Sequence, residues 1–485
     1  MSTRPVRLSR KPNLIVFLTD QQRADTMACY GNSKVHAPNL NKLASDSVVF
    51  ERAYVTQPVC TPSRSSLMTG LWPHTTGCTS NGSVLDPKFK VLPQLIQDRD
   101  YRTAYMGKWH LGSQGPAQRG FEQWISTQHL SDYSRFLVSK GVVPDRETGR
   151  FSALAVSGLP LELSQPKFLE QQACDFIRKH QHEPFILIVA FVEPHPPYNG
   201  PLNDEHSAAD VDVDLTAHTP LGADVPLRYR LMQEWQRARA TDDPTGKRRR
   251  HFGITDDDFR SIKQRYLGLI TLIDQSVGGI LACVEKAELK NHTAIVFTSD
   301  HGDTLGAHQL FGKEVMYEEA VRAPYFVRLP GRRAGRVANL VSHIDFVPTM
   351  IDLLGQAGAE QCSGTSLLPV IRGESTSAKS VFIEWSPNRY AASVRQKVKK
   401  GTKLGSVRSI KRALDESART VVTPDGWKLS LRDKDLNELY NLNDDPTEVR
   451  NLYYRGQHAA IISRCAAEIQ RWQEATGDTL KLPFS

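Results

Sequence analysis

The stretch CTPSRSSLMTG, residues 60–70, decides the fold and the chemistry that this chain can support. Pro62 predicts the first turn of a helix, because the N–H that proline lacks is not needed there. Cys60 would then lie at the helix N-terminus, where backbone dipoles favour an anion and lower the pKa of a thiol. Arg64 follows about one turn later on the same face. A reactive group beside a fixed positive charge suits chemistry on an anionic ester.

Three other apolar runs predict buried strands of an α/β sheet, and each leads into a polar loop. These runs are residues 13–18, 185–191 and 294–298. The polar side chains that follow them are Asp20, Gln21, His195, Asp300 and His301. Because ligands bind at the carboxyl ends of strands in such sheets, we expect these side chains to converge.

Four of these side chains predict a cation site. Asp20 and Asp300 offer carboxylates, Gln21 offers an amide oxygen and His301 offers an imidazole. A mostly oxygen-donor set of this kind suits Ca²⁺, Mg²⁺ or Mn²⁺. Acidic strand ends are common without a metal, so each pair on its own also fits a purely structural role.

The length of 485 residues allows one large α/β domain and a smaller one. We expect a catalytic domain over residues 1–373 and a small α+β domain over 374–485, where short strand-like pieces precede a terminal helix. Residues 200–260 are polar with weak periodicity, and we interpret them as an irregular insertion over the active face. Longer apolar patterns predict helices over 266–284 and 342–354.

The net charge of +8 is concentrated in one segment. Residues 385–414 carry nine Lys or Arg and no Asp or Glu, and a shorter basic run covers 247–250. Both are interpreted as solvated loops or as arms that recruit a polyanionic substrate. Neither has the interleaved aromatic residues of a single-strand nucleic-acid site, so no nucleic-acid partner is expected.

Seven cysteines are scattered without paired spacing, which predicts reduced thiols. The apolar run near the N-terminus is too short for a signal-peptide core, and we expect no segment as long as a membrane span. The chain is therefore expected to be cytoplasmic and without a membrane partner, or secreted or periplasmic if a leader has been removed.

The run that begins at Cys60 resembles the signature of the type I sulfatases, Cys-x-Pro-Ser-Arg with a Leu-x-Thr-Gly ending. Further blocks are similar to that family: MGKWHLG at 106–112, the Gly-Lys at 312–313 with Tyr-Glu-Glu and Arg-x-Pro after it, and the C-terminal block at 425–452. The resemblance implies an alkaline-phosphatase-like fold, with a large mixed sheet between helices and a small C-terminal antiparallel sheet. It also implies that a formylglycine-generating enzyme converts Cys60 to Cα-formylglycine.

The resemblance further implies the roles of single residues. Asp20, Gln21, the group at position 60, Asp300 and His301 would bind one divalent cation, Ca²⁺ first and Mn²⁺ or Mg²⁺ as alternatives. Lys108 and Lys313 would bind sulfate oxygens, and His110 would contact the formylglycine. Arg64 would favour the ionised nucleophile, and His195 would protonate the leaving alcohol.

The function that follows is hydrolysis of a sulfate monoester, carried by a small molecule or a saccharide. Two alternatives stay open. Asp-Gln and Asp-His pairs also resemble those of phosphonate monoester hydrolases, so a phosphonate or phosphodiester substrate on the same scaffold is the first. The second is a non-catalytic polyanion-binding protein that uses the 385–414 segment.

Overall fold

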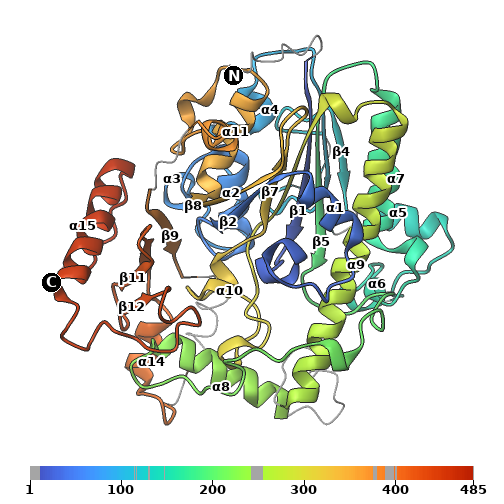
Figure 1. Cartoon of the computed structure of the whole chain (residues 1–485). Helices are drawn as coiled ribbons and strands as arrows, with labels where there is room; N and C mark the ends of the chain where they lie inside the picture. The colour runs from blue at the N-terminus through green and yellow to red at the C-terminus, as the bar shows by residue number, and fades with distance from the viewer. Residues whose placement is uncertain are drawn as a thin grey trace.

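The computed structural model describes residues 11–483 apart from 114, 116, 129–131, 147, 242–254, 375–378, 388–397 and 399–400. The basic run at 247–250 and most of the basic residues of 385–414 therefore lie outside the described residues. Figure 1 shows a large sheet with helices on both sides and a small sheet at one edge. This arrangement confirms the predicted fold class.

The large sheet has eight strands in the order β4-β3-β5-β1-β6-β7-β2-β8. Their bounds are β1 Asn13–Asp20, β2 Val48–Tyr54, β3 Arg102–Gly107, β4 Gln123–Ser126, β5 Phe185–Pro194, β6 Thr293–Ser299, β7 Tyr325–Arg328 and β8 Gly335–Ser342. The sheet is mixed, because β7 runs antiparallel to both β6 and β2 while the other pairs are parallel. The three apolar runs predicted as strands are its neighbouring central strands β5, β1 and β6.

Helices cover both faces of this sheet because its central strands are apolar on both sides. One face packs against α1 (Pro38–Ser45), α7 (Gln165–Lys179) and α9 (Asp256–Lys286); the other packs against α2 (Cys60–Thr69), α4 (Leu92–Leu95) and α11 (Phe346–Leu353). The remaining short helices of the large domain are α3 Pro73–Thr76, α5 Asp132–Ser139, α6 Ala153–Ser157, α10 Glu318–Val321 and α12 Leu368–Ile371.

Helix α9 is longer than the sequence pattern indicated. It begins at Asp256, where Thr255 and Asp258 form a reciprocal capping box, and runs for 31 residues. By length and composition it could cross a membrane, which corrects the expectation that no segment reaches that length. Within the structure, 67% of its most apolar window is buried, as befits a core helix.

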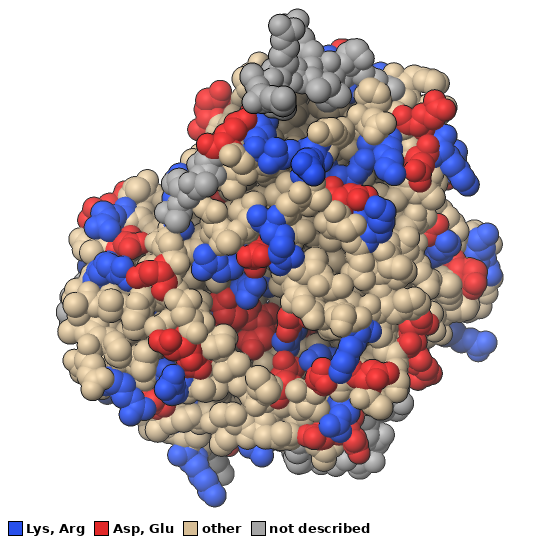
Figure 2. Space-filling view, in the orientation of Figure 1, with Lys and Arg blue, Asp and Glu red and all other residues tan. Residues whose placement is uncertain are grey.

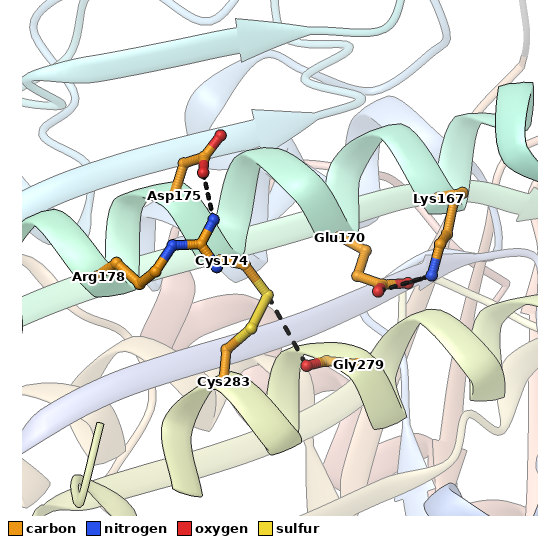
Figure 3. Close-up of a disulfide and its surroundings, with 7 residues drawn as sticks. All are labelled: Lys167, Glu170, Cys174, Asp175, Arg178, Gly279 and Cys283. Atoms are coloured by element: carbon orange, nitrogen blue, oxygen red, sulfur yellow. Dashed lines mark hydrogen bonds and ion pairs between the residues drawn. A yellow bond between two sulfur atoms is a disulfide. The ribbon is translucent and has the colours of Figure 1, made fainter. Parts of the chain in front are cut away.

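The expectation of reduced thiols is wrong for one pair of cysteines. Cys174 of α7 and Cys283 of α9 form a disulfide (Figure 3). Near this bond, a Cβ at Gly279 of α9 would lie 2.2 Å from Oε1 of Glu170 in α7, so the Glu170 side chain lies directly against the glycine. The two cysteines are 109 residues apart, so the pairing depends on helix packing and leaves no mark in the sequence spacing.

The small sheet is antiparallel, in the order β12-β11-β10-β9. Its strands are β9 Val381–Trp385, β10 Ala418–Val422, β11 Trp427–Arg432 and β12 Glu438–Asn441, and the helices of this part are α14 Val407–Ala413 and α15 Ala459–Thr476. Helix α15 packs an apolar face on β10 and β11.

Residues 200–260 are not irregular throughout, contrary to the prediction. Helix α8 covers Leu227–Thr241 and lies beside α14 (Figure 1). Its first turn is tied to the small domain, because the backbone N–H of Leu227 donates to Asp435 and Arg228 pairs with the buried Glu416 at 2.7 Å. Helix α8 therefore contacts the small domain as well as the large one. It is not only an insertion over the active face, as was expected.

Candidate active site

The site forms where β1 and β6 end side by side. Thr19 and Ser299 are paired in register, so Asp20 and Asp300 leave the sheet at the same edge. The backbone N–H of Gln21 donates to Oδ1 of Asp300 at 3.0 Å. Gln21 itself adopts a left-handed conformation with a φ of 68°, which turns the chain sharply after the strand. Two carboxylates therefore lie together in a fully buried position.

Helix α2 brings Cys60 to the same edge, since its first residue is Cys60 and Pro62 lies in its first turn as predicted. The hydroxyl of Ser63 donates to the backbone carbonyl of Asp300 at 2.5 Å, which ties the helix to the loop after β6. The helix ends at Gly70, whose φ is 70° and where a Cβ would lie 2.6 Å from the sulfur of Cys362. A side chain at this position would therefore clash with Cys362 and with Val347 of α11.

Four buried side chains form a compact donor cluster: Asp20, Cys60, Asp300 and His301, whose ligand atoms all lie within 4.8 Å of one another. Nδ1 of His301 lies 2.8 Å from the carbonyl of Gly302 and is therefore assigned the proton. Nε2 then faces the sulfur of Cys60 at 3.2 Å with its lone pair available. The donor types and the assigned tautomer fit a divalent cation.

Arg64 braces the two carboxylates from behind. Its Nε donates to Oδ2 of Asp300 at 2.7 Å, and a terminal nitrogen donates to Oδ2 of Asp20 at 3.1 Å. The other terminal nitrogen donates to the carbonyl of Lys108 at 2.6 Å. Each nitrogen of the guanidinium thus donates to a neighbouring group, so Arg64 orients the two acids.

Two lysines point at the sulfur of Cys60. Nζ of Lys313 lies 2.9 Å from the sulfur and 2.7 Å from Oε1 of Gln21. Nζ of Lys108 lies 3.7 Å from the sulfur and pairs with Asp20. Burial and Asp20 oppose ionisation, yet Lys108 and Lys313 hold the pKa of the Cys60 thiol well below its usual range. The site therefore stabilises negative charge at position 60.

The two carboxylates differ in their titration. Burial opposes ionisation of Asp20, but Lys108 with its neighbouring cations lowers the pKa of Asp20 well below its usual range. Burial and the negative charge of Asp20 raise the pKa of Asp300. The pair thus carries unequal charge, and a bound cation would favour the ionised form of both.

The structure treats the two predicted histidines differently. His195 follows β5, with Nδ1 at 2.7 Å from the carbonyl of Pro196, and burial together with Lys313 lowers its pKa to about 3. His110 has a φ of 61° and accepts a hydrogen bond from Thr61 through its backbone carbonyl. Among the described residues no hydrogen bond joins His110 to Cys60, and its Nδ1 is buried without a partner.

A cavity of about 240 Å³ lies next to Lys108 and His195. Its walls are partly apolar and partly polar, and they include Gln128, Val156, Gln165, Glu193, Pro197, Asn199, Leu269 and Leu272. Burial raises the pKa of Glu193 to about 7, and its Oε2 has no hydrogen-bond partner among the described residues. The cavity is placed to hold whatever group is attached to an anion bound by the lysines.

A second cavity, of about 300 Å³, is lined by charged residues. Figure 2 shows acidic side chains gathered in a hollow on the face that carries α10. The acids that line this second cavity include Asp25, Asp214, Glu318 and Glu319. Because Arg23 pairs with both Asp25 and Asp214, much of this charge is already balanced internally.

Sequence reasoning missed Asp303 and Glu193. Asp303 is fully buried beside the cluster and accepts hydrogen bonds from Gln21, Tyr198 and two backbone N–H groups. Its place two residues after His301 was a signal that could have found it. Glu193 lies two residues before His195, and only the packed cavity shows that it faces the site.

The sequence model of the sulfatase family, described as Sulfatase, matches residues 12–356. The N-acetylglucosamine-6-O-sulfatase of Bacteroides thetaiotaomicron is 27% identical over 499 residues, covering 93% of this chain and 84% of that protein. The choline-sulfatase of Rhizobium meliloti is 26% identical over 466 residues, covering 91% and 82%. A solved structure of a phosphonate monoester hydrolase from Silicibacter pomeroyi superposes with a TM-score of 0.78 at 22% identity, covering 96% of both chains.

Proposed function

The chain belongs to the sulfatase family, and we propose that it hydrolyses a sulfate monoester to an alcohol and sulfate at Cys60. The single observation that carries this proposal is the position of the Cys60 sulfur. It lies among buried oxygen and nitrogen donors, with the Nζ atoms of Lys313 and Lys108 at 2.9 and 3.7 Å from it. A nucleophile held beside a cation site and two fixed ammonium groups is suited to attack on an anionic ester.

The cation would be held by Asp20, Gln21, Asp300 and His301 together with the group at position 60. The donor set fits, since the ligand atoms of Asp20, Asp300, His301 and position 60 lie within 4.8 Å of one another. The amide oxygen of Gln21 accepts a hydrogen bond from Lys313, whose Nζ also contacts the sulfur of Cys60. When bound, a divalent cation polarises an oxygen ligand and neutralises charge on the ester. We propose Ca²⁺ first, with Mn²⁺ and Mg²⁺ as alternatives, because oxygen donors predominate.

We further propose that a formylglycine-generating enzyme oxidises Cys60 to formylglycine before the protein is active. The hydrated aldehyde carries two hydroxyl groups, and one of them would supply the attacking oxygen. The other would allow sulfate to be expelled afterwards. A thiol could not replace the hydrated aldehyde, because a thiol has no second group through which sulfate can be expelled. Helix α2 keeps this position at its N-terminus, and Arg64 keeps both neighbouring carboxylates in place.

Lys108 and Lys313 would hold the sulfate oxygens. Both ammonium groups are directed at position 60, so they neutralise charge where it increases during attack on sulfur. His195 would protonate the leaving alcohol, and this requires an imidazolium. A bound anion beside Lys313 offsets the positive charge that lowers the pKa of His195, so substrate binding itself raises that pKa.

The leaving group would occupy the cavity beside His195. Its mixture of apolar walls with Glu193, Gln128 and Asn199 suits a compact group that carries hydrogen-bond donors, such as a sugar or a small hydroxylated or cationic alcohol. The relatives named above act on a saccharide sulfate and on choline sulfate. We therefore propose a saccharide or small-molecule sulfate ester.

The test combines mass spectrometry of the peptide that contains position 60 with a measurement of turnover in the same preparation. Conversion to formylglycine lowers the mass of the Cys60 peptide by about 18 Da, and the fraction converted should equal the fraction of active enzyme. Cys60→Ala should abolish sulfate release, with circular dichroism unchanged. An active preparation in which every Cys60 is an unmodified thiol would contradict the proposal.

Hydrolysis of a phosphonate monoester is the second candidate, because Gln21 and His301 resemble the ligands of those enzymes. Aryl sulfate and aryl phosphonate should be compared at equal concentration and with each cation in turn. A much higher kcat/KM for the phosphonate would reverse the order of the two proposals. A polyanion-binding role of residues 385–414 stays a prediction, although residues 407–413 of this stretch form α14 and pack on α8. Replacing its Lys and Arg by Gln would support that role if polyanion binding were lost and turnover were unchanged.

A further inference from the structure

Asp303 is the residue in which three parts of the site meet. It lies in the loop after β6, is fully buried, and is not one of the clustered donor groups. Oδ2 accepts a hydrogen bond from Nε2 of Gln21 at 2.6 Å and another from the hydroxyl of Tyr198. Oδ1 accepts from the backbone N–H groups of Leu305 at 2.8 Å and Gly312 at 2.7 Å. Four donors thus converge on one carboxylate.

These donors come from three separate segments that carry predicted site residues. Gln21 follows β1, Tyr198 lies three residues after His195, and Gly312 directly precedes Lys313. The Asp303 carboxylate therefore holds three segments together. They are the loop of His195, the predicted proton donor; the loop of Lys313, a predicted sulfate-binding residue; and Gln21, a predicted cation ligand. Because each bond is buried, loss of one partner leaves a polar group unsatisfied.

The bond to Gln21 determines which end of its amide faces the site. Nε2 can only donate and Oε1 can only accept, and the two ends are otherwise nearly the same shape. With Nε2 on Asp303, Oε1 is directed to Nζ of Lys313 at 2.7 Å, on the side of Cys60. If the amide rotated by half a turn, its NH₂ would face the lysine and could not bind a cation.

We propose that Asp303 is a positioning residue that holds the Gln21 amide with its oxygen toward the cation, an inference that rests on the proposed cation site. A carboxylate at position 21 would need no such partner, because either of its oxygens can serve as a ligand. The neutral amide at position 21 in this chain does need one. Asp303 therefore fixes the direction of an amide that could otherwise present either end to the site.

Asp303→Asn isolates this role while preserving the side-chain size. The backbone N–H groups of Leu305 and Gly312 require an acceptor, so the oxygen of the new amide should take the position of Oδ1. Its NH₂ would then face Nε2 of Gln21, and two donors in contact favour rotation of the Gln21 amide. Adding Gln21→Glu removes the conflict, since one carboxylate oxygen accepts from the amide introduced at position 303 and the other still faces the cation.

The first readout is the affinity of the purified full chain for Mn²⁺. It is measured by electron paramagnetic resonance in the absence of substrate. Asp303→Asn should weaken Mn²⁺ binding by about 10–100-fold, the usual effect of losing a partner behind a metal ligand. The double variant Asp303→Asn with Gln21→Glu should recover most of that loss. Asp274→Asn is the matched control, since Asp274 is also a buried acid but caps α1 through Leu40 and Asn39.

A metal-free readout separates this inference from the proposed function. Urea unfolding in EDTA gives the midpoint denaturant concentration of the wild type, of both single variants and of the double variant. These four values make a double-mutant cycle for positions 303 and 21. Gln21→Glu alone places two carboxylates together and should lower the midpoint, whereas the double variant should regain it. Independent, additive midpoints, or unchanged Mn²⁺ affinity in Asp303→Asn, would overturn the role of Asp303. Absence of Mn²⁺, Ca²⁺ and Mg²⁺ binding in the wild type, with the midpoint coupling intact, would instead refute the cation and keep the orientation.

Discussion

Nε of Arg64 donates to Oδ2 of Asp300 across 2.7 Å, and both side chains are almost wholly buried. The bond joins the second turn of α2 to the loop after β6, so it connects the helix that carries position 60 to the predicted cation ligands. Arg64 also reaches Asp20, which makes it the counter-charge of two neighbouring acids. Arg64 was expected to act on the nucleophile at position 60. The structure shows that it contacts the neighbouring carboxylates of Asp20 and Asp300, through which it influences that position.

Removal of this brace should destabilise the protein strongly. Arg64→Ala removes the arginine partner of the buried Asp300 and one of the two cationic partners of Asp20, which costs roughly 3–5 kcal/mol of unfolding free energy. Arg64→Lys should recover only part of it, because an ammonium cannot supply the three-sided fork. Urea unfolding in EDTA measures the change. An Arg64→Ala variant as stable as the wild type would show that the acids are neutral or otherwise paired.

His195→Ala should affect substrates according to their leaving groups. Loss of a general acid lowers kcat by about 10²–10⁴-fold when the alcohol is a poor leaving group such as a sugar hydroxyl. Hydrolysis of 4-nitrophenyl sulfate should fall much less, because nitrophenolate leaves without a proton. Steady-state kinetics on both substrates give the ratio. Equal losses on the two would assign His195 to binding in place of proton transfer.

The disulfide between Cys174 and Cys283 should be detectable and stabilising. It closes a separation of 109 residues, and its removal in Cys174→Ser with Cys283→Ser should cost about 2–4 kcal/mol of unfolding free energy. Non-reducing peptide mapping tests the bond, with Cys29→Ser as a control that touches neither cysteine. Disulfides persist in oxidising compartments, so a mapped bond in protein from its native source would contradict the cytoplasmic prediction. Two alkylatable thiols there would contradict the bond.

His74 should make stability depend on pH. Its Nδ1 lies 2.7 Å from Glu384 of β9 and its Nε2 lies 3.2 Å from the carbonyl of Thr476 in α15, so both ring nitrogens face acceptors. Burial opposes the charged ring, but the hydrogen bond to Glu384 raises the pKa of His74 above its ordinary value of 6.5. The extra stability is therefore full below pH 6.5 and is lost as the pH rises through the folded-state pKa.

His74→Gln should accordingly lower the unfolding free energy by about 1.5–3 kcal/mol at acidic pH and by much less at pH values well above that pKa. Thermal unfolding across a pH series measures the difference. His182→Gln, at an exposed position before β5, is the matched control. A stability loss that is the same at every pH would mean that His74 stays neutral in the folded protein.

The sequence by itself determined the elements that depend on local pattern. Residues 13–18, 185–191 and 294–298 form central strands because burial in the core removes their apolar side chains from water. Pro62 and the residues after it predicted the start of α2, and the order of polar residues after each strand predicted a common edge. Register then brings Asp20 and Asp300 together, since parallel neighbours end on the same side of the sheet.

The tertiary structure alone decided what depends on side chains that are distant in sequence. The use of Arg64 as a brace, the side-chain bonds of Asp303 to Gln21 and Tyr198, and the disulfide between α7 and α9 each join residues that are far apart along the chain. Helix α8 was missed because its apolar side chains pack into two different clusters and show no single apolar face in the sequence. Its first turn is also held by Glu416 and Asp435, which are distant along the chain. Hydrophobic burial specifies where strands and helices lie, whereas a hydrogen bond between two loops exists only after those elements have packed.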